Sequence, residues 1–221
     1  MQELKTIAKN FINLFYPLHC LGCAKQLDAL NKFHLCGQCI GSIKCNAMPP
    51  FELETSSVIA YSACLYEGIT KDLIHSFKYK GKTALTGIFA KIMINYIREN
   101  PEITEVDMIT AVPLHKARLK EREFNQSLLL ANKIAKEFSM PIKHTLEKTV
   151  KTRYQNELSK SDRLVNLKNA FRVYKNTNIS GKSILLIDDV MTTGATLNEC
   201  AGILLSGDAK RVTCLTLARG I

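Results

Sequence analysis

Four cysteines near the N-terminus are spaced for binding a single metal ion. They form two CxxC pairs separated by twelve residues, Cys20 with Cys23 and Cys36 with Cys39. Two thiolates two residues apart can reach one ion from a tight turn, and two such turns complete a tetrahedral four-sulfur site. The spacing therefore predicts structural Zn²⁺ with no coordination position left open for catalysis. His19 and His34 lie next to the pairs and are alternative ligands.

A second chemical motif lies near the C-terminus, where residues 184–197 read ILLIDDVMTTGATL. An apolar strand delivers two carboxylates, Asp188 and Asp189, to its end, and a loop rich in hydroxyls then opens a helix. Backbone N–H groups at a helix start form a cradle for one phosphate, and Gly194 allows the backbone to approach it closely. Acids beside that cradle can hold ribose hydroxyls or a magnesium ion. Together these features predict a ribose 5-phosphate site.

The basic residues are concentrated in one segment. The whole chain has a formal net charge of +10, and residues 115–175 carry 15 Lys or Arg against 6 Asp or Glu. Such a segment suits a polyanionic partner, whether nucleic acid, phosphorylated metabolite or anionic lipid. A solvated face that keeps the protein in solution is the alternative explanation.

These motifs resemble a known family. The strand with paired acids and the threonine-rich loop are similar to the phosphoribosyl-pyrophosphate (PRPP) loop of type I phosphoribosyltransferases. With the twin CxxC segment in front, the order of motifs resembles that of the ComF family, the ComFC/GntX-like competence proteins, over nearly the whole chain. The intervening motifs are FKYKG at 77–81, VPLH at 112–115, RLKEREFNQ at 118–126, KTRYQ at 151–155 and RLVN at 163–166.

The resemblance implies a role for each matching residue. PRPP with Mg²⁺ is expected at Asp188, Asp189, Thr192, Thr193, Gly194, Ala195 and Thr196. Pyrophosphate or another anion is expected at Pro113, Leu114, His115, Arg118 and Arg122. Nucleic acid is expected at Lys120, Lys151 and Arg153, with Tyr79, Phe124 and Tyr154 as aromatics on which bases can stack.

One position departs from the family motif, and two others have more than one interpretation. The family's usual Arg-Gly-Phe-Asn-Gln stands here as residues 122–126, REFNQ, so Glu123 adds a side chain and a negative charge where glycine is usual. Asn125 and Gln126 either read a base edge or ligand, or serve the start of a helix, Asn125 as its cap.

The resemblance implies a cytoplasmic competence protein that binds single-stranded DNA during uptake in natural transformation. A helicase-like uptake ATPase is an expected partner. The alternative is an active, Mg²⁺-dependent phosphoribosyltransferase acting on a nucleobase or related acceptor, although no residue identifies that acceptor. In a third possibility, the PRPP site acts as a sensor or is a structural relic beside a DNA-binding groove.

Alternating apolar patterns supply the elements that must position these residues. Helical spacing is present over 69–77, 85–97, 124–138 and 196–205, and apolar runs typical of strands cover 106–112, 183–187 and 212–217. This alternation predicts an α/β fold with a mostly parallel sheet flanked by helices and ligands at the carboxyl ends of the strands. We expect an N-terminal helix and zinc ribbon over 1–46, a Pro-containing linker over 47–56 and a type I phosphoribosyltransferase-like domain over 57–221.

Composition excludes several classes of protein. With 221 residues, 46% hydrophobic and 23% charged, the chain suits a globular protein and excludes disordered and collagen-like architectures. No apolar run approaches the ~20 residues of a membrane span, and the first segment is a poor signal peptide, so we expect no membrane insertion and a cytoplasmic location. Cys200 and Cys214 lie in apolar patterns and are expected in the core, whereas Cys45 and Cys64 are isolated.

Overall fold

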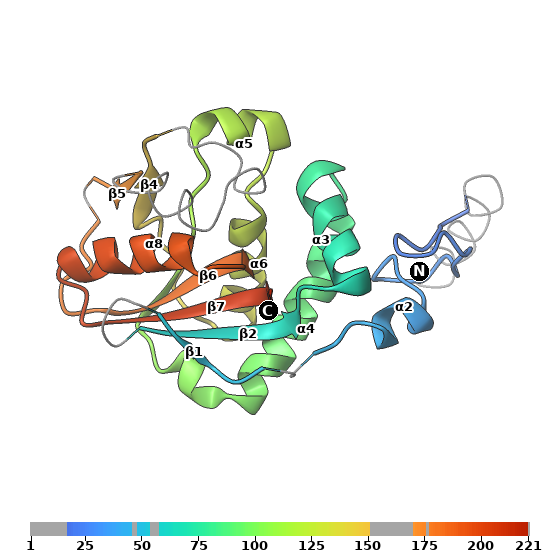
Figure 1. Cartoon of the computed structure of the whole chain (residues 1–221), viewed down its shortest axis with the longest axis horizontal. Coiled ribbons are helices and arrows are strands. Elements are labelled where there is room, and N and C mark those ends of the chain that lie inside the picture. The colour runs from blue at the N-terminus through green and yellow to red at the C-terminus, as the bar shows by residue number, and fades with distance from the viewer. Residues whose placement is uncertain (1–16, 46–47, 54–57, 151–169, 176, 221) are drawn as a thin grey trace, which may run out of the picture.

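The computed structural model describes residues 17–45, 48–53, 58–150, 170–175 and 177–220 (Figure 1). The expected N-terminal helix, Lys151, Arg153 and Tyr154 lie outside these residues. Within them, no helix has both the length and the apolar character needed to cross a bilayer.

A five-stranded sheet forms the centre of the fold, in the order β1-β2-β7-β6-β3. Strands β2 (Ile59–Leu65), β7 (Arg211–Arg219), β6 (Ser183–Met191) and β3 (Met108–Ala111) are parallel, and β1 (Phe51–Glu52) pairs antiparallel with β2 at the edge. A separate antiparallel pair joins β4 (Leu146–Lys148) and β5 (Phe171–Val173). The predicted mostly parallel sheet is confirmed.

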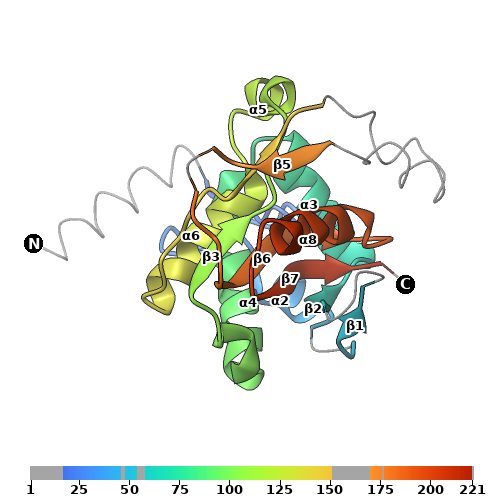
Figure 2. The same cartoon turned by 90° about the vertical axis from the view of Figure 1, so that its left-hand side faces the viewer.

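Helices cover both faces of this sheet (Figures 1 and 2). On one face lie α3 (Gly68–Tyr79), α4 (Thr86–Glu99) and α6 (Gln126–Glu137), and on the other lies α8 (Ala195–Ser206). Short elements complete the fold: α2 (Gly37–Gly41), α5 (Lys116–Arg122) and 3₁₀ turns at Thr83–Leu85 and Pro101–Thr104.

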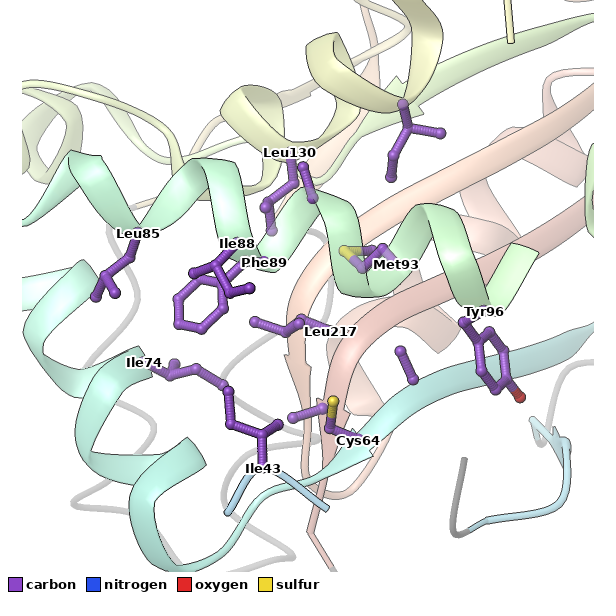
Figure 3. Close-up of a cluster of buried hydrophobic side chains, with 14 of the residues drawn as sticks. Ile43, Cys64, Ile74, Leu85, Ile88, Phe89, Met93, Tyr96, Leu130 and Leu217 are labelled. Atoms are coloured by element: carbon purple, nitrogen blue, oxygen red, sulfur yellow. The ribbon is translucent and has the colours of Figure 1, made fainter. Parts of the chain in front are cut away.

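Each face of the sheet has its own apolar core. Successive residues of β6 point to opposite faces, so Leu185 and Ile187 join the core under α4 and α6, whereas Ile184 and Leu186 join the core under α8. All four are fully buried, which explains why this strand reads as a continuous apolar run rather than an alternating one. Figure 3 shows the first core, with Phe89 and Met93 of α4 facing Leu217 of β7.

The four-cysteine module packs directly on the larger domain. We use this name for residues 17–45, which contain both CxxC pairs and α2. Leu35 and Ile43 of the module belong to the same buried cluster as Ile74 and Phe77 of α3. Ile43 lies beside Cys64 of β2 in Figure 3. The module therefore shares a core with the sheet.

The structure corrects three details of the sequence-based predictions. Phe51–Glu52 is a sheet strand and Leu53 is buried, so these residues of the predicted linker 47–56 are part of the fold. Strand β6 continues to Met191, so the paired acids lie within the strand rather than at its end. Cys45 and Cys64, isolated in sequence, face each other across a β-bridge. Cys200 and Cys214 are buried, as predicted.

Candidate functional site

The four predicted metal ligands come together at one point. The Sγ atoms of the two CxxC pairs lie within 4.8 Å of one another, and those of Cys23 and Cys36 are 3.7 Å apart. Four thiolates around Zn²⁺ at ~2.3 Å have sulfur–sulfur separations of roughly 3.8 Å, so the geometry fits this ion. Neither His19 nor His34 belongs to a metal-binding cluster among the described residues.

Backbone groups prepare the cluster for a cation. The N–H groups of Gly22 and Cys36 donate to Cys20 Sγ over 3.4 and 3.3 Å. Burial opposes ionisation of Cys20, yet these donors and the Cys23 N–H lower its pKa to about 6. Burial and the neighbouring cysteines raise the pKa of Cys39, because a second negative charge is unfavourable without a cation. A Cβ on Gly22 would lie 2.8 Å from Cys39 Sγ, which explains the glycine in the first turn.

The predicted phosphate loop forms the start of α8. Gly194 is the N-cap residue of α8, and its φ of +77° is a left-handed conformation that favours glycine. The Gly194 carbonyl accepts a hydrogen bond from the Asn198 N–H over 2.8 Å, which closes the first turn of the helix. A small cavity is lined by this loop together with Asp188; its loop residues are Thr192, Thr193, Gly194, Ala195 and Thr196. The structure therefore brings the predicted loop residues together around one cavity at a helix N-terminus.

The paired acids beside this loop are held by two different helices. Lys78 Nζ of α3 lies 2.7 Å from Asp189 Oδ1, and both side chains are largely buried. Ser127 Oγ of α6 donates to Asp188 Oδ1 over 2.7 Å. Burial and the neighbouring Asp189 raise the pKa of Asp188 to about 7, although Lys78 and Ser127 oppose this shift. Asp188 consequently titrates near neutral pH, whereas Asp189 is engaged in an ion pair.

Both acids line a larger cavity at the carboxyl ends of β3 and β6. Of the predicted anion-binding residues, Pro113, Leu114, Arg118 and Arg122 line it too, as does Thr196 of the phosphate loop. His115 instead caps α5, because its Nδ1 accepts the Ala117 N–H over 3.2 Å, and it is not among the residues that line this cavity. Lys120 lies on the exposed surface of α5 and does not line the cavity either.

The cavity also contains residues to which the sequence analysis assigned no role. Those with polar or aromatic side chains are Lys78, Ser127, Lys148 and Phe171. Lys78 lies four residues after the core residue Ile74, so helical periodicity places it on the inward face of α3. Lys148 of β4 lies 4.9 Å from the Phe171 ring centre, and burial, together with Arg118, lowers its pKa to about 8. The short strands that position Lys148 and Phe171 had no periodic signal.

The residues around position 125 have structural roles. Asn125 caps α6, its Oδ1 accepting the Leu128 N–H over 3.3 Å, as one of the two interpretations predicted. Gln126 is buried and donates to the Lys78 carbonyl over 3.4 Å, and Arg122 donates to its Oε1 over 3.3 Å. Glu123 has a φ of +67° at the C-terminus of α5. This left-handed conformation accounts for the usual glycine at the position.

A second, more apolar cavity adjoins the first. Its volume is about 610 Å³, and Pro113, Leu114 and Lys148 line both cavities. Its apolar lining comes from Leu119, Phe124, Leu128, Leu129, Leu146 and Tyr174. The site thus combines a threonine-rich loop at a helix N-terminus, two acids, several basic residues and an adjacent apolar space.

Comparison with known proteins identifies relatives over most of the chain. Residues 125–221 match the family described as the phosphoribosyl transferase domain. Competence protein F of Haemophilus influenzae is 29% identical over 210 residues, which cover 90% of each chain. Competence protein ComFC of Bacillus subtilis is 32% identical over 160 residues, 72% of this chain and 63% of that protein. DNA utilization protein YhgH of Escherichia coli K12 is 29% identical over 87% of this chain and 81% of its own.

Solved structures similar to the chain are more distant. A hypoxanthine phosphoribosyltransferase from Staphylococcus aureus is 14% identical over 61% of this chain and 64% of its own, with a TM-score of 0.40. The allosteric regulatory enzyme of purine biosynthesis is 17% identical over 60% of this chain, with a TM-score of 0.42, and the match spans about a quarter of that enzyme, 26%. The match to the domain family, together with the sheet order and the loop, identifies a type I phosphoribosyltransferase-like fold.

Proposed function

The chain belongs to the ComF family of competence proteins, and on that premise we propose that it binds incoming single-stranded DNA during natural transformation. The strand would cross the carboxyl ends of the sheet, beside a cavity that binds PRPP or a related ribose phosphate. We further propose a cytoplasmic location and, from the family resemblance, a helicase-like uptake ATPase as partner.

The observation that carries this proposal is a pair of exposed aromatic rings, each covered by an arginine. The Arg122 guanidinium lies 4.7 Å from the Tyr79 ring centre, and that of Arg219 lies 5.2 Å from the ring centre of Phe51. As residues, Tyr79 and Phe51 are 39% and 43% exposed, whereas aromatic side chains in folded proteins are more often buried. Aromatic faces bind bases and arginines bind the phosphate backbone, which is how proteins hold single strands.

Both pairs lie next to the ribose-phosphate site. Tyr79 and Arg122 line the cavity that contains the paired acids. Phe51 approaches the phosphate loop, since a Cβ on Gly194 would lie 4.0 Å from its ring. A strand contacting both rings would therefore cross the mouth of the cavity, where Arg118 and Lys148 add positive charge.

The acidic residues of the cavity fit Mg²⁺ only when the ion is also coordinated by the phosphates of a bound substrate. Asp188 offers a half-buried carboxylate, whereas one oxygen of Asp189 is engaged by Lys78. Mg²⁺ commonly takes one or two protein carboxylates and completes its shell with substrate phosphates and water. Asp188 would hold such an ion and the phosphate loop the 5-phosphate, and the ion would supply charge neutralisation at the phosphates. At the four-cysteine cluster, the bound metal that we propose is Zn²⁺.

The test is fluorescence anisotropy with a labelled oligothymidine and zinc-loaded protein across a salt series. We expect log affinity to fall linearly with log salt, with a slope near −0.7 for each phosphate contact. The Tyr79→Ala and Phe51→Ala variants should each lose ~1–3 kcal/mol of binding free energy. Arg122→Ala should weaken binding and reduce the slope by about one contact.

The matched control is Lys210→Ala, which removes an exposed positive charge at the opposite, amino-terminal edge of the sheet. Its affinity should stay within about twofold of the parent, because the charge lies away from the proposed path. Binding that ignores salt, or that falls equally in Lys210→Ala and Arg122→Ala, would refute the proposed path.

A phosphoribosyltransferase activity is the second candidate, and the apolar cavity next to the ribose-phosphate site favours it. A planar acceptor base would fit a space of about 610 Å³ that shares Pro113, Leu114 and Lys148 with the first cavity. Incubation with PRPP, Mg²⁺ and a panel of nucleobases would reveal a nucleotide product. Its formation by the parent and its loss in Asp188→Asn would establish transfer; no product with any base would leave binding as the activity.

A further inference from the structure

Two cysteines outside the metal cluster face each other where the four-cysteine module meets the sheet. Cys45 ends the module and Cys64 lies in β2, and their Sγ atoms are 3.0 Å apart. We propose that these two residues form a thiol pair that closes to a disulfide by exchange with a low-molecular-weight disulfide, cross-linking the module to the sheet.

The backbone already has the arrangement that a disulfide requires. Cys45 and Cys64 are partners in an isolated antiparallel β-bridge, and the Leu65 N–H donates to the Lys44 carbonyl over 2.9 Å beside it. Directly opposed residues in antiparallel pairs have Cβ atoms about 4.5–5.5 Å apart, and disulfides span Cβ separations of about 3.5–4.5 Å. The sulfurs are already 3.0 Å apart, so bond formation needs them to approach by about 1 Å, to the ~2.05 Å of an S–S bond, with a small closing of the bridge.

The two thiols differ in the way that an attacking and a resolving cysteine differ. Cys45 is exposed to solvent. A hydrogen bond from the Cys64 thiol lowers the pKa of Cys45, and this effect outweighs the opposing effects of desolvation and of the nearby Glu99 carboxylate. Cys64 is buried, and its hydrogen bond to Cys45 and its burial raise its pKa. Thiolate character and solvent access together determine which cysteine reacts first. A reagent in solution therefore meets the Cys45 thiolate first.

The reaction proceeds in two balanced exchanges. The Cys45 thiolate attacks one sulfur of an external disulfide, RSSR, which forms a Cys45–SR mixed disulfide and releases RS⁻. Cys64 then loses its proton to solvent and attacks the Cys45 sulfur, which forms the Cys45–Cys64 bond and releases a second RS⁻. The protein loses two electrons and two protons in total, counting the proton lost when Cys45 ionised, and the external disulfide is reduced to two thiols.

The cross-link is separate from the metal cluster. The cysteines grouped around one point are Cys20, Cys23, Cys36 and Cys39, and neither Cys45 nor Cys64 is a member. Because a bound metal occupies those four thiolates, the Cys45–Cys64 pair becomes the reactive one in zinc-loaded protein. A disulfide here restricts the unfolded chain between residues 45 and 64 and should raise the thermal midpoint by roughly 5–10 °C.

The test treats the full-length, zinc-loaded protein with oxidised glutathione. We expect the intact mass to fall by two hydrogen atoms, peptide mapping to assign the bond to Cys45 and Cys64, and the zinc content to stay at one ion per chain. The thermal midpoint should rise and should return to its initial value after reduction. In Cys64→Ala, glutathione should remain attached to Cys45, because the resolving thiol is absent.

Two variants distinguish this pair from the other cysteines. Cys45→Ser should show neither the mass loss nor the glutathione adduct. Cys214→Ala removes a buried thiol elsewhere in the sheet and should still form the disulfide. Bonds between other cysteines, release of zinc in step with oxidation, or free Cys45 and Cys64 after prolonged treatment would each overturn the proposal.

Discussion

The four-cysteine module and the cavity that contains the paired acids are assembled in different ways. All four cysteines of the module's cluster lie within twenty residues of one another, Cys20 and Cys23 on a turn and Cys36 and Cys39 at the start of α2. The cavity takes residues from α3, β3, α5, α6, β4, β5, β6 and the start of α8 or their adjoining loops. The module is thus encoded by local spacing, whereas the cavity depends on how distant elements pack. A single substitution in the module should therefore disrupt the whole metal-binding cluster, whereas a single substitution in the cavity should change only the contacts of the substituted residue.

The largest effect is expected from breaking the module. Cys36→Ser removes one of four thiolates and should abolish stable zinc binding, at a cost of several kcal/mol, because the metal supplies folding energy that a small segment lacks. Metal content and circular dichroism would measure the loss. If the two regions are independently assembled, affinity for PRPP with Mg²⁺ should change by less than about twofold. A parallel loss of that affinity would show that the shared core couples them.

The next largest effect is expected at the ion pair in the cavity. Lys78→Met leaves Asp189 buried without its partner and should destabilise the protein by about 3–5 kcal/mol, measured by urea unfolding. The control Lys80→Met removes an exposed lysine two residues away and should cost less than about 0.5 kcal/mol. The double variant Lys78→Met/Asp189→Asn should recover part of the loss, and no recovery would argue against the pairing.

Asp188 makes the free energy of unfolding of the protein depend on pH. Its folded pKa of about 7 lies above the ~3.9 of an unfolded aspartate, so the native state binds more protons between these values. Its contribution to the free energy of unfolding is therefore largest at low pH and falls as pH rises from about 4 to 7, by at most ~1.4 kcal/mol per unit. Asp188→Asn should remove this dependence. Urea titrations from pH 5 to 8 would measure it, and identical slopes in parent and variant would contradict it.

The smallest effect is expected at the end of α5. Glu123 adopts a left-handed conformation that costs a residue with a side chain about 1–2 kcal/mol, whereas glycine adopts it readily. Glu123→Gly should therefore stabilise the protein by ~1 kcal/mol or less, since glycine also loses more chain entropy on folding. Glu121→Gly, within the helix, should instead destabilise it by a similar amount. The two urea midpoints should move in opposite directions; a shift of both in the same direction would exclude strain at residue 123.

Features that depend on local contacts could be predicted from the sequence, whereas most features that depend on contacts between distant elements could not. The main helices, the parallel sheet and the phosphate loop were predictable, because periodicity and turn chemistry repeat over a few residues. Lys78 carried a usable signal, its spacing from Ile74. Lys148 and Phe171 carried none, because strands of three residues are too short to show a pattern. His115 was assigned to anion binding from the family motif, and its use as a helix cap depended on where α5 begins.

The residue order alone specifies which chemical groups are present and which of them are neighbours along the chain: the CxxC pairs, the paired acids that follow an apolar run and the loop that starts α8. Residues two or three positions apart are held by the same turn, so their spacing specifies their geometry. Packing of the folded chain is what pairs Lys78 with Asp189, Ser127 with Asp188 and Cys45 with Cys64. These contacts join elements whose separation is set by side-chain packing in the two cores, which no local pattern records.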